Sequence, residues 1–171
     1  IVEDNPYGDL CYEGRPLPSI KSMDKTGRVI YLGSFSKTFT PGVRIGWLLA
    51  AEPLIEKMIT AKQATDLCSN SLSQRLVYRC STSGFIDNPV RFLIEAYRGK
   101  RALMLSCMEE FFPDGVTWTN PAGGFFIWVI FPPGLVAAEL LRKSLEKKVA
   151  FVDGRGFYVN GKGKNTARFS F

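Results

Sequence analysis

Hydrophobic and polar residues alternate along the first part of the chain in two different patterns. Short apolar and β-branched runs at residues 1–4, 28–32 and 43–49 are typical of strands, and the segments that separate them are rich in glycine, proline and serine. In residues 53–64 the apolar side chains instead recur three and four positions apart, which predicts a helix. Strands that alternate with helices are typical of an α/β fold.

The second part of the chain begins with the signals of helices. Apolar spacing predicts one helix over residues 72–80, and Asn88-Pro89 is typical of the start of a second, longer one that ends near Phe112. Beyond this helix the pattern predicts a small α+β domain. Its strands are expected at residues 116–119, 125–131, 149–152 and 167–171, and its helix at 135–148.

Composition and charge exclude several classes of protein. With 46% hydrophobic and 22% charged residues, the chain is neither disordered nor collagen-like. No apolar run reaches the roughly 18 residues of a membrane span, and the first residues lack the basic start and apolar core of a signal peptide. The net charge of +6 does not predict nucleic-acid binding through this segment, because basic and acidic residues are interleaved along the predicted helices.

Cysteine and histidine usage narrows the chemistry. The 4 cysteines form no C-x-x-C pair, so neither a zinc site nor a disulfide framework is expected, and the thiols are predicted to be reduced. The expected location is cytoplasmic, because neither a membrane span nor a signal peptide is predicted. Histidine is absent, which removes the usual general base of serine and cysteine hydrolases and the commonest metal ligand. We therefore expect no metal site, and any catalysis must use lysine, a carboxylate or a cofactor.

Lys37 lies in the polar loop G-S-F-S-K-T-F-T-P-G between two predicted strands. A lysine amine forms imines with carbonyl compounds such as pyridoxal phosphate, although a lysine in a polar loop is more often simply solvated. Ser34 and Ser36 can donate hydroxyl hydrogen bonds to an anion, and Arg44 has a positively charged guanidinium that can donate two parallel hydrogen bonds to a phosphate. Together these residues would hold a phosphate group near the amine.

Two residues near the start of the chain extend this hypothesis. Asp4 ends the first predicted strand, where open α/β sheets place their binding crevices, and its carboxylate can pair with a pyridinium nitrogen. The hydroxyl of Tyr7 can hydrogen-bond the phenolic oxygen of the pyridoxal phosphate ring. Taken singly, Asp4 is more simply a loop cap and Tyr7 a packed aromatic residue.

Four motifs in this order resemble those of the fold-type-I pyridoxal-phosphate aminotransferases, class I/II. The closest resemblance is to the branch that acts on 2-aminoadipate, aromatic and branched-chain amino acids, and it covers almost the whole chain. The motifs are E-D-N-P-Y-G-D at 3–9, G-S-F-S-K-T with P-G-V-R-I-G-W at 33–47, N-P-A-G-G-F-F at 120–126 and N-T-A-R-F-S-F at 165–171.

The resemblance implies a role for each candidate residue. Lys37 would be the catalytic Schiff-base lysine, which holds pyridoxal 5'-phosphate and later acts as general base. Asp4 would pair with the pyridine nitrogen, and Arg168 would bind the α-carboxylate of the substrate. The implied cofactor contacts are Asp4, Tyr7, Ser34, Ser36, Lys37 and Arg44. The substrates would be an L-amino acid and a 2-oxo acid, with 2-oxoglutarate expected as the amino acceptor.

The resemblance also implies how the chain is organised. Residues 1–88 would be the C-terminal part of the cofactor-binding large domain, with an open, mainly parallel sheet. Residues 89–171 would be a linking helix and a small α+β C-terminal domain. Family members have a long N-terminal half with further cofactor contacts, so the chain is expected to be a truncated part of an enzyme that works as a homodimer. Val152-Asp153-Gly154 departs from the proline-containing turn expected at that point.

Two alternatives remain open from the sequence. Some winged-helix transcription regulators carry an aminotransferase-like effector domain with the same lysine motif, although P-Y-G at residues 6–8 favours the enzyme. Another fold-type-I chemistry, such as that of a β-lyase, would use the same residues. Residues 156–163 nearly match a P-loop, but Gly163 stands where Ser or Thr would bind magnesium, and a strand is predicted to follow, so a hairpin turn is expected.

Overall fold

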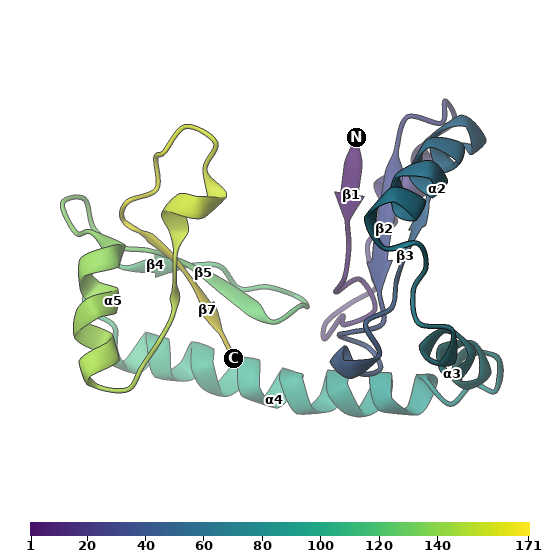
Figure 1. Cartoon of the computed structure of the whole chain (residues 1–171). Helices are drawn as coiled ribbons and strands as arrows, with labels where there is room; N and C mark the ends of the chain where they lie inside the picture. Colours follow the sequence, from purple (N-terminus) through teal and green to yellow (C-terminus); the bar gives the residue numbers. More distant parts are fainter. The chain divides into compact units, whose positions relative to one another are not determined.

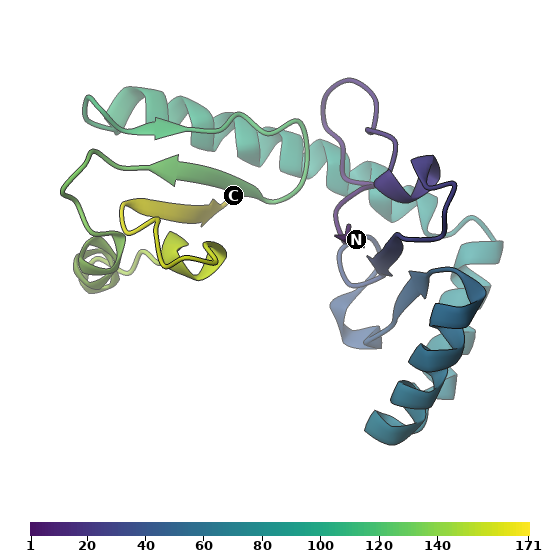
Figure 2. The same ribbon diagram turned by 90° about the horizontal axis from the view of Figure 1, so that it is seen from above.

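The computed structural model describes residues 1–171, the whole chain. Contacts between Cα atoms divide it into two compact units, Ile1–Glu95 and Ala96–Phe171. The long helix α4 (Asp87–Phe111) supplies residues to both units, and each unit contains a β-sheet of its own (Figures 1 and 2). No helix combines the length and the apolarity that a membrane span requires.

The sheet of the first unit is built, in this order, from β1 (Val2–Asp4), β2 (Ile30–Ser34) and β3 (Gly46–Leu49). Strands β1 and β2 are parallel, with Asp4 opposite Leu32, whereas β2 and β3 are antiparallel, with Ser34 opposite Gly46. A long connection joins the parallel pair and a short one joins the antiparallel pair, as these two geometries require. The predicted α/β class is confirmed, and within this chain the sheet is mixed.

Three longer helices follow this sheet along the chain: α2 (Glu52–Asp66), α3 (Ser71–Thr82) and α4. Proline in the first turn favours the start of α2. At the start of α3, the side chain of Asn70 accepts a hydrogen bond of 3.0 Å from the amide of Ser73. These helices confirm the three that are predicted from the sequence, and α4 continues without a break through Gly99.

A short helix, α1 (Ile20–Met23), is missing from the sequence prediction, because so few residues carry no periodic signal. Its first amides are held by Glu3 of β1, whose carboxylate accepts hydrogen bonds from the backbone N–H of Ile20 at 3.0 Å and of Lys21 at 2.8 Å. A carboxylate at a helix start satisfies amides that have no partner within the helix.

Asp24 closes α1 and organises the turn that leads into β2. Its carboxylate accepts hydrogen bonds from the amides of Val29 and Thr26, each at 2.9 Å, and forms a 3.2 Å ion pair with Lys21. These amides, Val29 foremost, hold the pKa of Asp24 well below its usual range, because they stabilise the charged carboxylate.

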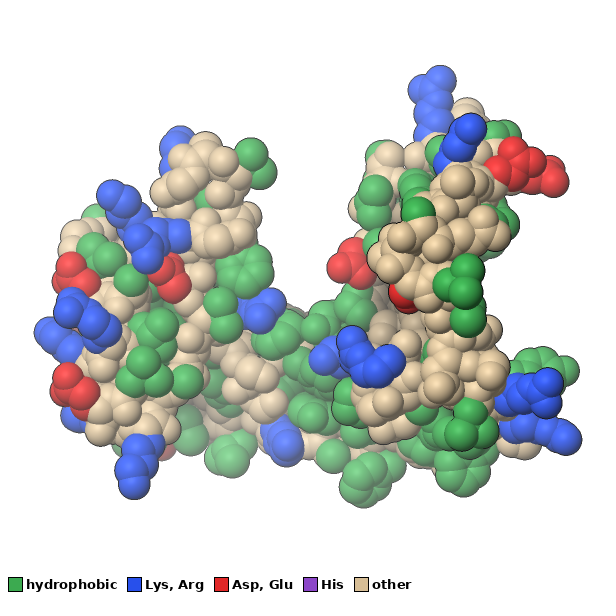
Figure 3. Space-filling model, in the orientation of Figure 1, with side chains coloured by type: hydrophobic (Ala, Val, Ile, Leu, Met, Phe, Trp, Pro, Cys, Tyr) green, Lys and Arg blue, Asp and Glu red, His purple; other side chains and the backbone are tan.

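Little of the first unit is buried within this chain. Every residue of β3 is exposed, including Trp47 at 46% and Leu49 at 53%, and α2 has no buried residue. Figure 3 shows hydrophobic side chains at the surface among the charged ones. The buried hydrophobic residues of this unit are Leu10, Tyr12, Val29, Val43 and Val77.

The sheet of the second unit is antiparallel throughout and has the strand order β4-β5-β7-β6. Its strands are β4 (Thr117–Trp118), β5 (Phe126–Ile130), β6 (Val152–Asp153) and β7 (Thr166–Ser170). The helix α5 (Ala137–Glu146) precedes β6, and the 3-10 helix η2 (Gly154–Phe157) follows it.

Strand β6 begins later than the predicted residue 149. The amide of Val149 still donates to the carbonyl of Ser144 at 2.9 Å, and Lys148 has a positive φ of 61°. The chain is therefore still closing the end of α5 at the residues where the apolar run predicts a strand. The segment that nearly matches a P-loop leads into strand β7, as expected, and not into a helix.

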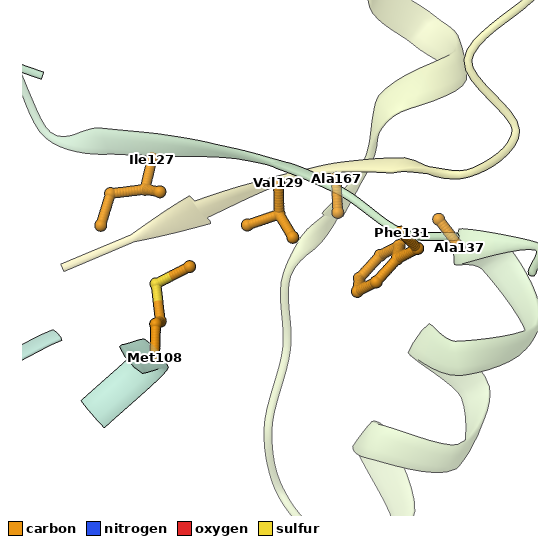
Figure 4. Packing of buried hydrophobic residues seen from close by; sticks show 6 residues of the cluster. All are labelled: Met108, Ile127, Val129, Phe131, Ala137 and Ala167. Atoms are coloured by element: carbon orange, nitrogen blue, oxygen red, sulfur yellow. The ribbon is translucent and has the colours of Figure 1, made fainter. Parts of the chain in front are cut away.

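The core of the second unit lies on one face of its sheet (Figure 4). Ile127 and Val129 of β5 are fully buried there. Ala167 of β7, the cross-strand partner of Val129, lies on the same face and is also buried. Phe126 and Trp128 alternate to the opposite face, together with Arg168. The buried cluster comprises Met108, Ile127, Val129, Phe131, Ala137 and Ala167.

Candidate functional site

The carboxyl ends of β1 and β2 lie side by side, because these strands are parallel and in register. The amide of Asn5 continues their pairing with a 3.1 Å hydrogen bond to the carbonyl of Leu32. This register places Asp4, at the end of β1, beside the last residues of β2, which end at Ser34. An exposed carboxylate and a strand-end hydroxyl thus share one edge of the sheet.

Lys37 is held in a tight turn directly after β2. The carbonyl of Phe35 accepts hydrogen bonds from the amides of Phe39 at 3.0 Å and Thr40 at 3.1 Å, so residues 35–40 form a helix-like turn. The amide of Ser36 donates to the hydroxyl oxygen of Ser34 at 3.1 Å. Both serines and Lys37 are half-buried. Hydrogen bonds within the loop therefore fix the backbone of Lys37, which carries the amine.

Arg44 lies at the other end of this loop, two residues before β3. It follows the 3-10 helix η1 (Pro41–Val43) and adopts the left-handed conformation, with φ 53° and ψ 39°. Its guanidinium donates to the carbonyl of Pro41 at 3.3 Å, and the side chain is otherwise exposed. A 3.1 Å bond from the amide of Phe35 to the carbonyl of Ile45 closes the base of this loop. Residues 34–44 therefore carry two cations, Lys37 and Arg44, and the hydroxyls of Ser34 and Ser36.

Tyr7 lies in the turn after β1, with its backbone carbonyl accepting from the amide of Leu10 at 2.9 Å. A cavity of about 470 Å³ is lined by residues from this turn and from the loop after β2, among them Asn5 and Thr38. Of the candidate residues only Ser34 lines it. The backbone thus places Asp4, Ser34, Ser36, Lys37 and Arg44 at one end of the sheet and Tyr7 in the adjoining turn. Arg44, however, lines a different cavity from the one that Ser34 lines.

Arg168 belongs to the second unit, on the face of β5 and β7 opposite the core. Its guanidinium lies over the ring of Phe126 at 4.0 Å and that of Phe157 at 4.9 Å, measured to the ring centroids. Each such contact stabilises the cation by about 0.5–2 kcal/mol. The Nε of Arg168 is buried and makes no hydrogen bond within the chain. A carboxylate would satisfy this donor.

Sequence analysis missed a second arginine of interest. Arg101 is only 5% exposed, and its guanidinium donates to the carbonyl of Pro121 at 2.5 Å. A signal was present, because Arg101 lies at helical spacing from the core residues Met104, Leu105 and Met108. A cation in the apolar stripe of a helix indicates a buried partner.

Comparison with known proteins places these motifs in a family. The whole chain, residues 1–171, matches the family Aminotransferase class I and II. It is 47% identical over 171 residues to aromatic-amino-acid aminotransferase 1 of Thermococcus litoralis, covering 100% of this chain and 41% of that protein. It is 36% identical over 171 residues to the uncharacterised HTH-type transcriptional regulator YisV of Bacillus subtilis, covering 100% of this chain and 35% of that protein.

A solved structure has the same fold. The crystal structure of Pyrococcus horikoshii kynurenine aminotransferase, in complex with PMP, matches 99% of this chain and 42% of its own, with a TM-score of 0.96 and 45% identity. The chain spans less than half the length of the curated relatives it matches. The match over all of its residues confirms the family that the four motifs predict. The chain belongs to the class I and II aminotransferases.

Proposed function

We propose that this chain carries the lysine-bearing part of a pyridoxal-phosphate-dependent aminotransferase, which transfers an amino group between an L-amino acid and a 2-oxo acid such as 2-oxoglutarate. The proposal is supported by the backbone positions of the candidate residues: those that bear a carboxylate, two serine hydroxyls, an amine and a guanidinium lie at one end of the sheet, at residue 4 and in residues 34–44. This end holds the carboxyl ends of parallel strands, where α/β proteins bind their ligands.

The chemistry of the donor set fits pyridoxal phosphate. Ser34, Ser36 and Arg44 offer hydroxyl and guanidinium donors to a phosphate dianion, and the Lys37 amine can bind the cofactor's carbonyl carbon covalently. The carboxylate of Asp4 suits a protonated ring nitrogen, and the phenol of Tyr7 suits the ring oxygen. Each polar group of the cofactor thus has a partner of matching chemistry among these six residues.

The bound cofactor would supply an electron sink for negative charge that develops at the substrate Cα. The residues of the chain do the rest. The carboxylate of Asp4 would pair with the ring nitrogen and favour its protonated form, which makes the ring a better electron sink. Lys37 would hold the cofactor through its Nζ, and the same amine, when unprotonated, would act as the general base that takes the proton from the substrate Cα. The turn that fixes the backbone of Lys37 limits where this amine can reach.

Arg168 would bind the α-carboxylate of the amino acid. The two phenylalanine rings hold its guanidinium plane, and its unsatisfied Nε leaves donors for a forked interaction with two carboxylate oxygens. This forked interaction would fix the orientation of the bound carboxylate.

A test of the proposal uses the full-length protein loaded with pyridoxal phosphate. Borohydride reduction followed by peptide mapping is expected to place the cofactor on Lys37, and K37A is expected to lose both the adduct and amino transfer. Loss of the general base alone costs about 10²- to 10⁴-fold in rate. Lys62, whose amine is paired with Asp66 on α2, provides the matched control, because K62A is expected to keep both. Retained turnover in K37A would refute the mechanism.

A second candidate is the effector domain of a winged-helix transcription regulator. It rests on the 36% identity of the whole chain to an HTH-type regulator, which is lower than the 47% identity to an aminotransferase. In such a domain the same residues would bind the cofactor without turnover. Specific binding of the full-length protein to promoter DNA, together with no amino transfer to 2-oxoglutarate, would establish this alternative. A β-lyase would instead release ammonia and a 2-oxo acid from a substrate with a leaving group at Cβ.

Three further parts of the proposal concern the whole protein. The family resemblance supports a homodimer and the assignment of residues 1–88 to the cofactor domain and 89–171 to the linking helix and small domain. A cytoplasmic location is supported by the cysteines, because Cys11, Cys68, Cys80 and Cys107 are all free thiols.

A further inference from the structure

Arg101 occupies a core position in the second unit. It lies on the face of α4 that also carries Met108, and both side chains are buried, at 5% and 2% exposure. Placing a guanidinium in such a position is unfavourable unless its N–H groups are hydrogen-bonded. Because an apolar residue at this position would bury itself without that cost, the guanidinium indicates a specific partner.

That partner is the loop of residues 120–125, which precedes β5. The Nη1 of Arg101 donates to the carbonyl of Pro121 at 2.5 Å, near the start of the loop. One helical turn earlier on α4, the ring of Tyr97 packs against Phe125 at the end of the loop, with 4.4 Å between centroids. Helix α4 therefore holds both ends of this loop.

The held loop ends directly before one of the two rings that sandwich Arg168. Phe126 is the first residue of β5, and the guanidinium of Arg168 lies 4.0 Å from its ring centroid. Phe157 of η2 covers the guanidinium at 4.9 Å and is itself half-exposed, so it is the looser of the two rings. A shift of the loop would move Phe126 first and the plane of Arg168 with it.

We propose that Arg101 is a positioning residue for substrate binding. Through the carbonyl of Pro121 it fixes the 120–125 loop, the loop fixes the ring of Phe126, and that ring sets the plane of the Arg168 guanidinium. The inference rests on the proposed function in one respect, namely that Arg168 receives the substrate carboxylate. Arg101 itself touches neither substrate nor cofactor in this scheme.

The experiment measures carboxylate binding separately from turnover. The full-length, cofactor-loaded protein is titrated by calorimetry with 3-phenylpropionate, a carboxylate that has no amino group to transfer. R168M defines the part of the affinity that depends on Arg168. R101M is expected to weaken this binding by about 10- to 100-fold, the effect of a small misplacement of a binding group. R101K, which can still donate to the carbonyl of Pro121, is expected to recover part of the affinity.

A matched control separates positioning from general loss of stability. M108A removes buried volume from the same face of α4, two helical turns after Arg101 and within the buried cluster of Ile127 and Val129, so it is expected to lower the unfolding midpoint and leave the affinity for 3-phenylpropionate unchanged. In turnover, R101M is expected to raise KM for the amino acid much more than it lowers kcat.

The outcomes distinguish this inference from the proposed function. Equal affinity of R101M and the unsubstituted protein, an equal loss in M108A, or binding that does not depend on Arg168 would each overturn the positioning role. If the unsubstituted protein binds 3-phenylpropionate through Arg168 in an Arg101-dependent manner but transfers no amino group, the proposed function fails and the positioning role stands.

Discussion

Replacing Gly154 by alanine is expected to destabilise the second unit strongly. A Cβ atom at residue 154 would lie 2.0 Å from the hydroxyl of Thr166 and 2.7 Å from its backbone carbonyl oxygen, against about 3.5–4.0 Å for an ordinary contact. Thr166 cannot give way, because it is 3% exposed and its backbone is paired with Ile130 in the sheet. We therefore expect a loss near the upper end of overpacking effects, about 3 kcal/mol.

The assay is urea unfolding followed by circular dichroism, with G156A as the matched control. Gly156 belongs to the same 3-10 helix, but a Cβ there would meet nothing within 4 Å. G156A should therefore be neutral, or more stable by about 0.4–1 kcal/mol through its less flexible unfolded chain. A G154A variant as stable as G156A would refute the reasoning. Because η2 carries Phe157, G154A should also weaken carboxylate binding at Arg168.

Three other predictions follow from contacts already described. Because its pKa is lowered in the folded state, the Asp24 carboxylate stabilises the fold above its unfolded pKa of about 3.9, and this stabilisation is lost as the pH falls toward the folded pKa. D24N should therefore reduce the decrease in the urea midpoint between pH 6 and pH 2, and an unchanged decrease would contradict this. R168K should raise KM for the amino acid by about 10- to 100-fold, with kcat less affected, because lysine cannot form the fork; equal effects on both constants would argue against the assigned role. I127A should cost about 2–5 kcal/mol in urea unfolding and I127V about 0.5–1.5, since the side chain is fully buried; a cost under about 1 kcal/mol for I127A would contradict the packing.

What the sequence could predict depended on how local the determining contacts are. The helices were predictable because apolar spacing and start signals such as Asn88-Pro89 lie within the segment itself. The grouping of Ser34, Ser36, Lys37 and Arg44 was equally accessible, because one short loop carries all of them. The place of Asp4 beside this loop depends on parallel pairing across residues 5–29, which only the strand-end rule for α/β sheets suggested.

The parts that escaped prediction rest on contacts between distant segments or on backbone strain. Nothing in the sequence around Phe157 indicates that its ring covers Arg168, because η2 reaches that face only through the β6–β7 pairing. The late start of β6 follows from the positive φ of Lys148, a residue type with no preference for that conformation.

The left-handed backbone of Arg44 has a practical consequence for engineering this protein. Three residues other than glycine have positive φ, namely Arg44, Leu67 and Lys148, and at each of them glycine would relieve about 1–2 kcal/mol of strain. A redesign that optimises folding stability alone would therefore choose glycine at all three. At residue 148 the side chain is exposed, so the substitution should change little besides the strain. At residue 67 it would also remove a side chain that lines the same cavity as Arg44, and at residue 44 it would delete a cation of the proposed cofactor site. Residue 44 should be kept fixed in any thermostabilised variant, even though its conformation makes it a favourable target.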